Sequence, residues 1–261
     1  MARRGYLWRA GALGAALSAV LSATGCGTHR SEPAPPARAA QSAPQDALSS
    51  RIGVLSIADA QGGGSTRSCT ASVVDSPRRD LLVTAAHCVY RAGEGPADGL
   101  TFLPGYRNGA SPQGSWPIDR IVVDQHWQDQ ADPEYDVAFL TVQPVDGRRI
   151  EDVLGGGNAL GVNRGFDLPV TVTGYPFDHE EPVTCATRTT AQSSTQQRFD
   201  CGGFSDGTSG SPWLTGVDPA TGTGTVVGVI GGYQQGGDTP DTSYSVSFDD
   251  RVSALYAQAV G

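Results

Sequence analysis

Three short segments of this 261-residue chain carry residues whose types and order could perform nucleophilic chemistry. His87 follows an apolar run ending in two alanines, Asp136 immediately precedes another apolar run, and Ser209 lies between glycines. A serine hydroxyl is a weak nucleophile until a neighbouring base takes its proton, and imidazole, with an ordinary pKa of about 6.5, suits that task. A buried carboxylate can then fix the histidine tautomer and stabilise the imidazolium that forms. The three residues could therefore act as base, orienting acid and nucleophile.

The order of these residues argues against other hydrolase classes. α/β-Hydrolases run in the order serine, acid, histidine, whereas no histidine follows Ser209 in this chain. Their nucleophile-elbow pattern also fails, because Ser211 occupies its last glycine position. The sequence contains no HExxH pattern, so a zinc protease has little support. We expect no metal and no cofactor.

At these segments the chain resembles the chymotrypsin-like serine proteases. Their motifs are TAAHC around the base, an aspartate leading an apolar strand, and GDSGGP around the nucleophile, and the matching stretches here are Thr84 to Cys88 and Gly207 to Pro212. The Gly-Thr-Ser-Gly-Ser-Pro variant is closer to secreted bacterial members, including the glutamyl endopeptidases. The resemblance covers about residues 51–261 and implies a serine endopeptidase that hydrolyses peptide bonds through an acyl-enzyme intermediate. It assigns His87, Asp136 and Ser209 to the catalytic triad.

Asp136 is chosen as the acid among several aspartates close together in the sequence. It directly precedes an apolar strand, which would carry it into the buried interior. The alternatives are Asp124, Asp129 and Asp132. His126 and His179 lie in polar, turn-rich surroundings, so we interpret them as surface residues.

The glycines around Ser209 allow the backbone to make a tight turn. In that turn the N–H groups of Gly207 and Ser209 are expected to form an oxyanion hole. Such donors stabilise the charge that develops in the transition state, and losing one typically costs about 10²–10³ in rate.

The residues that select the substrate are harder to identify. In trypsin an aspartate six residues before the nucleophile reads basic side chains, and here that position is Gly203. Glutamyl endopeptidases place a histidine on the strand that aligns with Val229 to Gly232, and none is present. Neither a preference for basic side chains nor one for glutamate can therefore be assigned to this chain. The residues expected to shape the pocket are Gly203, Phe204, Gly231, Gly232 and Tyr233.

Trypsin relatives are activated when a new N-terminal amine pairs with an aspartate just before the catalytic serine. Thr208 holds that position here and has no charge. The segment Arg51 to Val54 looks like an activation site, but we interpret it as the start of the first strand. The sequence therefore predicts no trypsin-type zymogen switch.

The five cysteines divide into one near the N-terminus and four in the folded part. The family resemblance pairs Cys69 with Cys88, beside the proposed base, and an oxidising compartment permits this. Cys185 and Cys201 would form the second disulfide, before the nucleophile. The fifth, Cys26, ends a stretch that looks like a lipobox, although Ala23 sits where leucine is commonest. The alternative is an ordinary signal peptide with Cys26 incidental.

The N-terminal residues read as an export signal followed by a linker. Arg3 and Arg4 precede an apolar run that is too short for a comfortable membrane span. We predict a signal peptide over residues 1–25, by either the twin-arginine or the general route, and an extracellular protein. Residues 26–50 would be a lipidated cysteine and a Pro/Ala-rich flexible linker, holding the protein at the outer face of the membrane.

From residue 51 onward, short β-branched runs alternate with Gly- and Pro-rich turns, which indicates an all-β fold. With the resemblance, we expect two six-stranded antiparallel β-barrels, over residues 51–150 and 151–261, with the active site between them. Asp249 and Asp250 could begin a short C-terminal helix with Val252, Leu255, Tyr256 and Ala259 on one face.

The net charge of −9 argues against nucleic acid as a partner, because nucleic-acid binding rewards basic patches. We expect protein or peptide substrates and a monomer. Two alternatives stay open: a catalytically silent binding module on the same fold, and an esterase using the same nucleophile.

Overall fold

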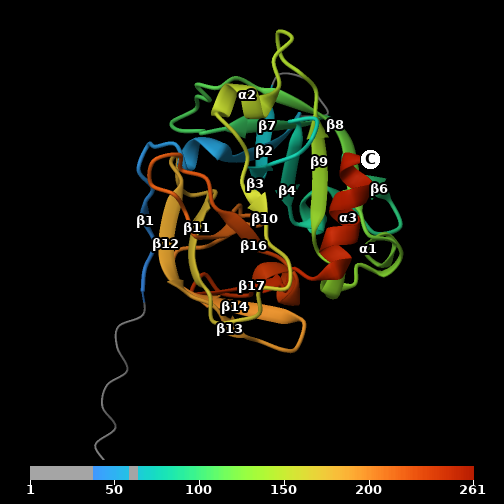
Figure 1. Cartoon of the computed structure of the whole chain (residues 1–261), viewed down its shortest axis with the longest axis vertical. Coiled ribbons are helices and arrows are strands. Elements are labelled where there is room, and N and C mark those ends of the chain that lie inside the picture. The colour runs from blue at the N-terminus through green and yellow to red at the C-terminus, as the bar shows by residue number, and fades with distance from the viewer. Residues whose placement is uncertain (1–37, 59–63) are drawn as a thin grey trace, which may run out of the picture. The chain divides into compact units, whose positions relative to one another are not determined.

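The computed structural model of the chain describes residues 38–58 and 64–261. The predicted signal peptide and Cys26 lie outside the described residues. Most of the regular secondary structure in the described part is β-strand, as predicted (Figure 1). None of the helices in this part is long and apolar enough to cross a membrane.

The first half is a closed barrel of six antiparallel strands. Its order around the barrel is β2, β3, β4, β9, β8 and β7. The strands are β2 (Ile52–Ala58), β3 (Ser65–Val74), β4 (Leu81–Thr84), β7 (Leu100–Pro104), β8 (Trp116–Val123) and β9 (Ala138–Val142). The two-stranded pair β5 (Tyr90–Arg91) and β6 (Gly95–Pro96) follows β4. Fully buried side chains such as Leu55, Phe102 and Leu140 pack in one cluster of this half.

The second half is also all-β but is not closed into a barrel. A six-stranded sheet has the order β1, β12, β11, β15, β16, β10, and a separate three-stranded sheet has the order β13, β14, β17. Its strands are β1 (Gln41–Ser42), β10 (Ala159–Leu160), β11 (Pro169–Gly174), β12 (Val183–Arg188), β13 (Thr190–Ala191), β14 (Gln196–Asp200), β15 (Pro212–Thr215), β16 (Thr225–Val229) and β17 (Thr242–Val246). The pair β10 and β16 is parallel. The all-β fold is confirmed, while a second barrel as regular as the first is not.

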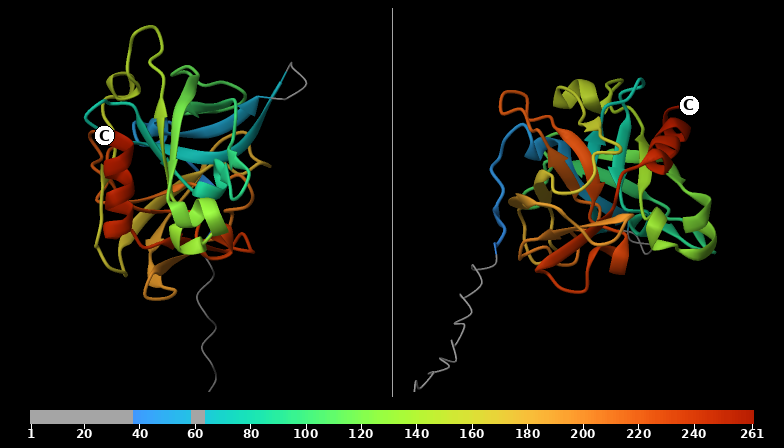
Figure 2. Two further views of the ribbon diagram at one scale, coloured as in Figure 1. Left: turned by 90° about the vertical axis from the view of Figure 1, so that its right-hand side faces the viewer. Right: turned by 60° about the horizontal axis from the view of Figure 1, so that its bottom comes forward.

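Helices are short, and the longest ends the chain. They are α1 (Gln125–Gln130), α2 (Ile150–Leu154) and α3 (Asp250–Val260), with 3₁₀ turns η1 (Ser49–Arg51), η2 (Ala86–Cys88), η3 (Pro133–Tyr135) and η4 (Tyr233–Gly236). The predicted C-terminal helix is confirmed: the Asp249 carboxylate accepts a hydrogen bond from the N–H of Arg251. On its predicted face Val252, Leu255 and Ala259 are buried, and Tyr256 is partly buried against the same cluster. Figures 1 and 2 show α3 lying along β8 and β9, so the chain ends against the first barrel.

Residues 38–50 differ from the flexible linker predicted from their composition. β1 pairs with β12, the N–H of Ala40 donates to the carbonyl of Gly202 at 2.7 Å, and the N–H of Gly202 donates to the carbonyl of Arg38. Ala43 is 4% exposed. Few apolar residues are needed here, because the segment is held by backbone hydrogen bonds to the edge of an existing sheet, which the composition cannot reveal.

Candidate active site

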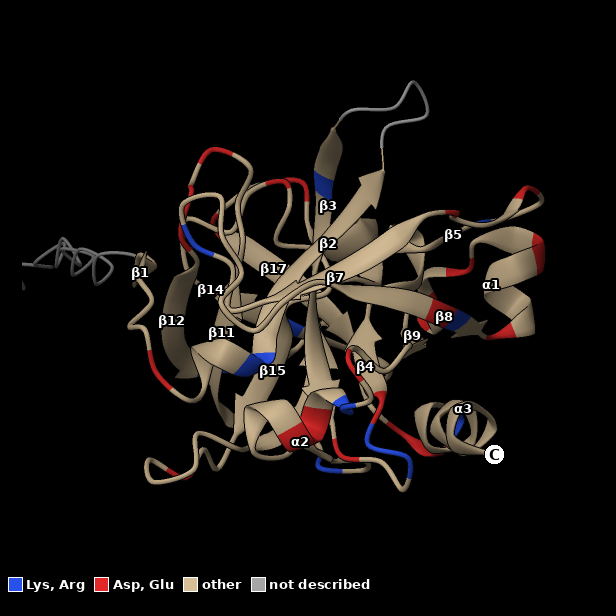
Figure 3. Cartoon of the chain, turned by 90° about the horizontal axis from the view of Figure 1, so that it is seen from above, with Lys and Arg blue, Asp and Glu red and all other residues tan. Residues whose placement is uncertain are grey.

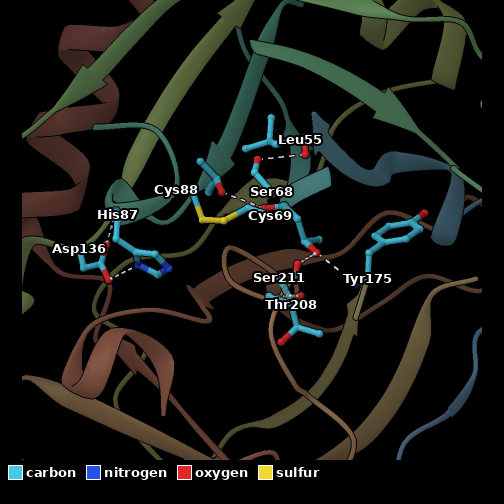
Figure 4. Close-up of a disulfide and its surroundings, with 12 residues drawn as sticks. Leu55, Ser68, Cys69, His87, Cys88, Asp136, Tyr175, Thr208 and Ser211 are labelled. Carbon is cyan, nitrogen blue, oxygen red and sulfur yellow. Dashed lines mark hydrogen bonds and ion pairs between the residues drawn. A yellow bond between two sulfur atoms is a disulfide. The ribbon is translucent and has the colours of Figure 1, made fainter. Parts of the chain in front are cut away.

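His87 and Asp136 come together from two segments beside the first barrel. His87 lies in the turn η2 just after β4, and Asp136 lies between η3 and β9, the strand that pairs with β4. His87 Nδ1 is 2.8 Å from Asp136 Oδ2, and the N–H of His87 donates to Asp136 Oδ1 at 2.9 Å. Figure 4 shows the aspartate beside the imidazole, with the disulfide close by. The sheet thus places the acid against the base.

The Asp136 carboxylate is held in one orientation by its neighbours. Its side chain is fully buried, and besides the two contacts from His87, Oδ2 accepts a hydrogen bond at 2.8 Å from the N–H of Gly232. A Cβ on Gly231 would lie 3.0 Å from the same oxygen. The two glycines after β16 therefore let the second half approach the carboxylate closely.

Two opposing effects set the pKa of His87. Burial by itself lowers the pKa, because it disfavours the charged imidazolium. The negative charge of Asp136 and its hydrogen bond outweigh burial and raise the pKa above its ordinary value of 6.5. Because Nδ1 is engaged with the carboxylate, the other ring nitrogen, Nε2, remains for a nucleophile or substrate.

Ser209 lies in a tight loop that the first barrel holds in place. The N–H of Thr70, on β3, donates to the carbonyl of Ser209 at 2.8 Å, and Thr70 Oγ1 donates to the carbonyl of Gly207 at 3.0 Å. Gly207 and Gly210 have φ of +96° and +81°, where glycine is favoured. A Cβ on Gly207 would lie 2.5 Å from the carbonyl oxygen of Tyr175. Glycine is therefore required at position 207.

His87 and Ser209 line one cavity of about 590 Å³. No hydrogen bond joins their side chains among the described residues. In unliganded hydrolases this contact is often long and tightens when substrate binds. The arrangement places an imidazole and a hydroxyl at one cavity, with a buried carboxylate behind the imidazole.

Backbone donors are available beside Ser209. Within the described residues, the N–H groups of Gly207 and Ser209 donate to no other protein group, whereas the N–H of Thr208 between them donates to the carbonyl of Ser205. Unpaired donors at a cavity can bind an oxygen that gains negative charge. These are the two N–H groups that the sequence assigns to an oxyanion hole.

The structure places most of the residues expected to shape the substrate pocket outside the lining of this cavity. Phe204 does line the cavity, but Gly203, Gly231, Gly232 and Tyr233 do not. Gly203 faces Ala40 instead, Gly231 and Gly232 approach Asp136, and Tyr233 packs edge-on against Tyr244. Motif matching gives the positions of pocket residues along the chain. It does not give the path of the loop after β16, which decides whether those residues face the cavity.

Several lining residues were missed. The cavity is also bounded by Ser68, Phe177, Asp206, Ile230 and residues 234–240. Among the residues that the structure describes, no Lys or Arg lines the cavity. Figure 3 shows Asp and Glu on several sides of the chain rather than gathered into one face, so the net charge gave no local signal for this site.

Both predicted disulfides are confirmed. Cys69 and Cys88 join β3 to the turn that carries His87, with Cα atoms 6.0 Å apart, and Cys185 and Cys201 join β12 to the end of β14, 6.7 Å apart. Cys69, Cys88 and His87 lie close enough to suggest a metal site by residue type. The disulfide removes the thiolates that a metal would need, and Nδ1 of His87 is taken by Asp136.

The other candidate acids and histidines lie outside this cluster. Asp124 caps α1 and contacts His126, Asp132 caps η3, and Asp129 accepts from Gln125. The side chains of His126 and His179 are 57% and 54% exposed. Of the four aspartates, Asp136 is the one that contacts His87.

Arg51 is not placed like an exposed activation site. It is 2% exposed, and its guanidinium donates to the carbonyls of Gly155, Gly156 and Ala47. β2 begins at Ile52, as the sequence predicted. A protease could not cut after Arg51 without first opening this packing.

Comparison with solved structures identifies the fold. A thermostable serine protease, AL20, from an extremophilic microorganism aligns with a TM-score of 0.72 and 24% identity over 82% of this chain and 99% of that chain. The protease Anisep from Arthrobacter nicotinovorans gives 0.71 and 24% over 83% and 98%. A Glu endopeptidase gives 0.66 and 17% over 85% and 96%. The chain has the chymotrypsin-like serine protease fold.

Sequence comparison adds less to the chymotrypsin-like assignment. No protein-family model matches the chain. An "Extracellular metalloprotease" of Bacillus subtilis (strain 168) is 30% identical over 115 residues, which is 44% of this chain and 35% of that protein. The chain thus spans about a third of the length of the curated relative that it matches.

Proposed function

We propose that the protein is a serine endopeptidase with His87 as base, Asp136 as orienting acid and Ser209 as nucleophile. The observation that carries the proposal is the buried 2.8 Å contact between His87 and Asp136 at the edge of a cavity that Ser209 also lines. The chymotrypsin-like fold and its protease neighbours support it.

The proposed reaction proceeds through two half-reactions. Ser209 Oγ attacks the carbonyl carbon of the peptide bond while His87 Nε2 takes the hydroxyl proton. The resulting oxyanion is bound by the N–H groups of Gly207 and Ser209. When the C–N bond breaks, the imidazolium gives its proton to the leaving amine, and an acyl-enzyme remains. A water molecule, deprotonated by His87, then releases the acid and restores Ser209.

Asp136 contributes by holding the imidazole. Its hydrogen bond to Nδ1 fixes the tautomer with Nε2 free to accept a proton, and its charge stabilises the imidazolium in both half-reactions. The same stabilisation of the imidazolium by Asp136 raises the pKa of His87 in the protein without substrate.

We also propose that the protein is exported and anchored through Cys26. Two disulfides in the described residues suit an oxidising compartment, and the curated relative is described as extracellular. A Cys26→Ser variant should move from the membrane fraction to the soluble fraction. Recovery of the variant in the membrane fraction would contradict the anchor.

An active-site-directed fluorophosphonate tests the enzyme directly. Wild-type protein should be labelled at Ser209, and Ser209→Ala should abolish labelling and lower turnover of a protein substrate by roughly 10⁶. Ser205→Ala is the matched control, because Ser205 lines the same cavity but should label normally. Folded wild-type protein that neither labels nor cleaves would indicate a binding module instead.

A further inference from the structure

Phe177 is exposed at the edge of the proposed active site. Its residue is 45% exposed, and the only other large apolar residue that the described part of the chain leaves so exposed is Tyr233, at 43%. A single exposed apolar side chain needs no explanation by itself. Phe177, however, lines the cavity with His87 and Ser209, whereas Tyr233 does not.

The backbone that carries Phe177 is firmly held. Arg67, on β3, donates from Nη2 to the carbonyl of Phe177 and from Nη1 to the carbonyl of His179, both at 2.7 Å. The N–H of Phe177 donates to the carbonyl of Asp206 at 2.8 Å. The Arg67 guanidinium also lies 5.5 Å from the ring centroid of Tyr106. These contacts hold the backbone on both sides of Phe177, which lines the cavity.

The ring lies directly against the proposed oxyanion hole. A Cβ built on Gly207 would be 2.6 Å and 2.8 Å from Cδ1 and Cε1 of Phe177. The N–H of Gly207 would bind the oxygen of the reacting carbonyl. The ring is therefore close enough to contact a substrate residue next to the scissile bond.

The two ends of the cavity face different parts of a bound peptide. Phe204 lies beside residues 236–240, because its N–H donates to the carbonyl of Pro240. Phe177 is instead joined through Arg67 to the part of β3 that carries Ser68 and Cys69, and so to the disulfide beside His87. His87 must reach the leaving amine to protonate it. The residues that follow the scissile bond therefore lie toward the disulfide and Phe177, and the acyl side chain lies toward Phe204.

We propose that Phe177 binds an apolar side chain of the substrate on the leaving-group side of the scissile bond. This rests on the proposed peptidase function and names one of its specificity determinants. A bound apolar side chain covers the exposed part of the ring. Arg67 is engaged by backbone carbonyls and by Glu180 at 3.7 Å, and the nearby lining carboxylate is Asp206, so this wall does not favour an acidic side chain.

The test compares substrates that share one acyl part. That part is taken from the sites that wild-type protein cuts in a digest of a denatured protein. One peptide carries Leu in the first two leaving-side positions, a second carries Asp there, and a chromogenic ester carries only an alcohol. Wild type should prefer the Leu peptide to the Asp peptide by at least about tenfold in kcat/KM.

Phe177→Ala should lower kcat/KM for the Leu peptide by about five- to tenfold, from loss of roughly half of the burial of one aromatic side chain. Turnover of the ester should change by less than about twofold. Phe177→Leu should restore most of the preference. Tyr233→Ala is the matched control and should leave the ratio of peptide to ester turnover unchanged.

The outcomes separate the two proposals. An equal loss on ester and peptide, or no loss on either, would overturn the role of Phe177 while the peptidase assignment stands. Equal use of Leu and Asp peptides by wild type would overturn it as well. Failure of wild type to hydrolyse ester or peptide, together with no fluorophosphonate labelling of Ser209, would overturn the function itself.

Discussion

Glu151, on α2, is a buried carboxylate far in sequence from the proposed nucleophile, and it should make stability depend on pH. It is 3% exposed, and its Oε1 accepts hydrogen bonds at 3.0 Å from both the N–H and the Oγ of Ser76. Burial raises the pKa of Glu151 from 4.5 to about 7, partly offset by the bonds from Ser76 and reinforced by the charge of Asp75. We predict that Glu151→Gln stabilises the protein above neutral pH.

The sign follows from proton linkage. Between pH 4.5 and about 7 the folded state binds more protons at Glu151 than the unfolded state, so the free energy of unfolding falls as pH rises through this window. Each pKa unit corresponds to about 1.4 kcal/mol, so a rise from 4.5 to about 7 gives an upper limit of roughly 3.5 kcal/mol for the loss. Solvent screening reduces this, so we expect about 1–3 kcal/mol.

Urea unfolding at pH 5, 6, 7 and 8, with disulfides intact, measures the effect. The Glu151→Gln variant should gain stability relative to wild type as pH rises, reaching about 1–3 kcal/mol at pH 8, because a neutral amide avoids the cost of burying charge. Taking the difference cancels the contribution of His87, whose raised pKa also makes stability fall with rising pH. Asp152→Asn, on the same helix with a 42% exposed side chain, is the control. A stability difference between wild type and the Glu151→Gln variant that stays constant from pH 5 to 8 would refute the reasoning.

Four predictions concern the proposed site. Asp136→Asn should fold but lose roughly 10⁴ in kcat, because the imidazole tautomer is no longer fixed; near-normal turnover of folded variant would contradict its role. kcat/KM should fall as pH drops below a His87 pKa that is raised above 6.5, and a midpoint well below 6.5 would be inconsistent. Gly207→Ala should lose at least about 10²-fold activity, because its Cβ would lie 2.5 Å from the Tyr175 carbonyl; a melting curve checks the fold. Peptides with Glu on the acyl side should be poor substrates, because the cavity is lined by Asp238 and by no Lys or Arg; efficient cleavage after Glu in a digest would show otherwise.

The sequence predicted the elements with strong local or motif signals. Alternating β-branched runs and turns indicated the β fold, and Asp249 marked the start of α3, because a capping carboxylate acts within one turn of helix. Residues 38–50 were misjudged because their order comes from backbone pairing with β12 and Gly202, to which side-chain composition contributes little. The sequence also failed to predict that the second half is not closed into a barrel, because strand pairing is made by backbone hydrogen bonds to which side-chain composition contributes little.

For the site, sequence motifs located His87 and Ser209, and the apolar strand after Asp136 selected it among four aspartates. The structure brings the base and acid into contact, as expected. The cavity walls could not be foreseen, since Phe177 and residues 234–240 reach it through loop paths that no local pattern encodes. The anchoring role of Thr70 was equally invisible, because its partners are the carbonyls of Gly207 and Ser209, more than 100 residues away in the chain.

Thr70, in the first half, helps to position the loop of the second half that carries Ser209, so activity should depend on contact between the two halves. It holds the loop that carries Ser209 through hydrogen bonds to the carbonyls of Ser209 and Gly207, and its Oγ1 also accepts the N–H of Tyr175 at 3.1 Å. If the halves drift apart by a few ångströms, the loop loses these tethers while every strand can stay intact. On heating, turnover should therefore be lost at a lower temperature than the circular dichroism signal of the strands. Turnover then reports whether the two halves are still in contact.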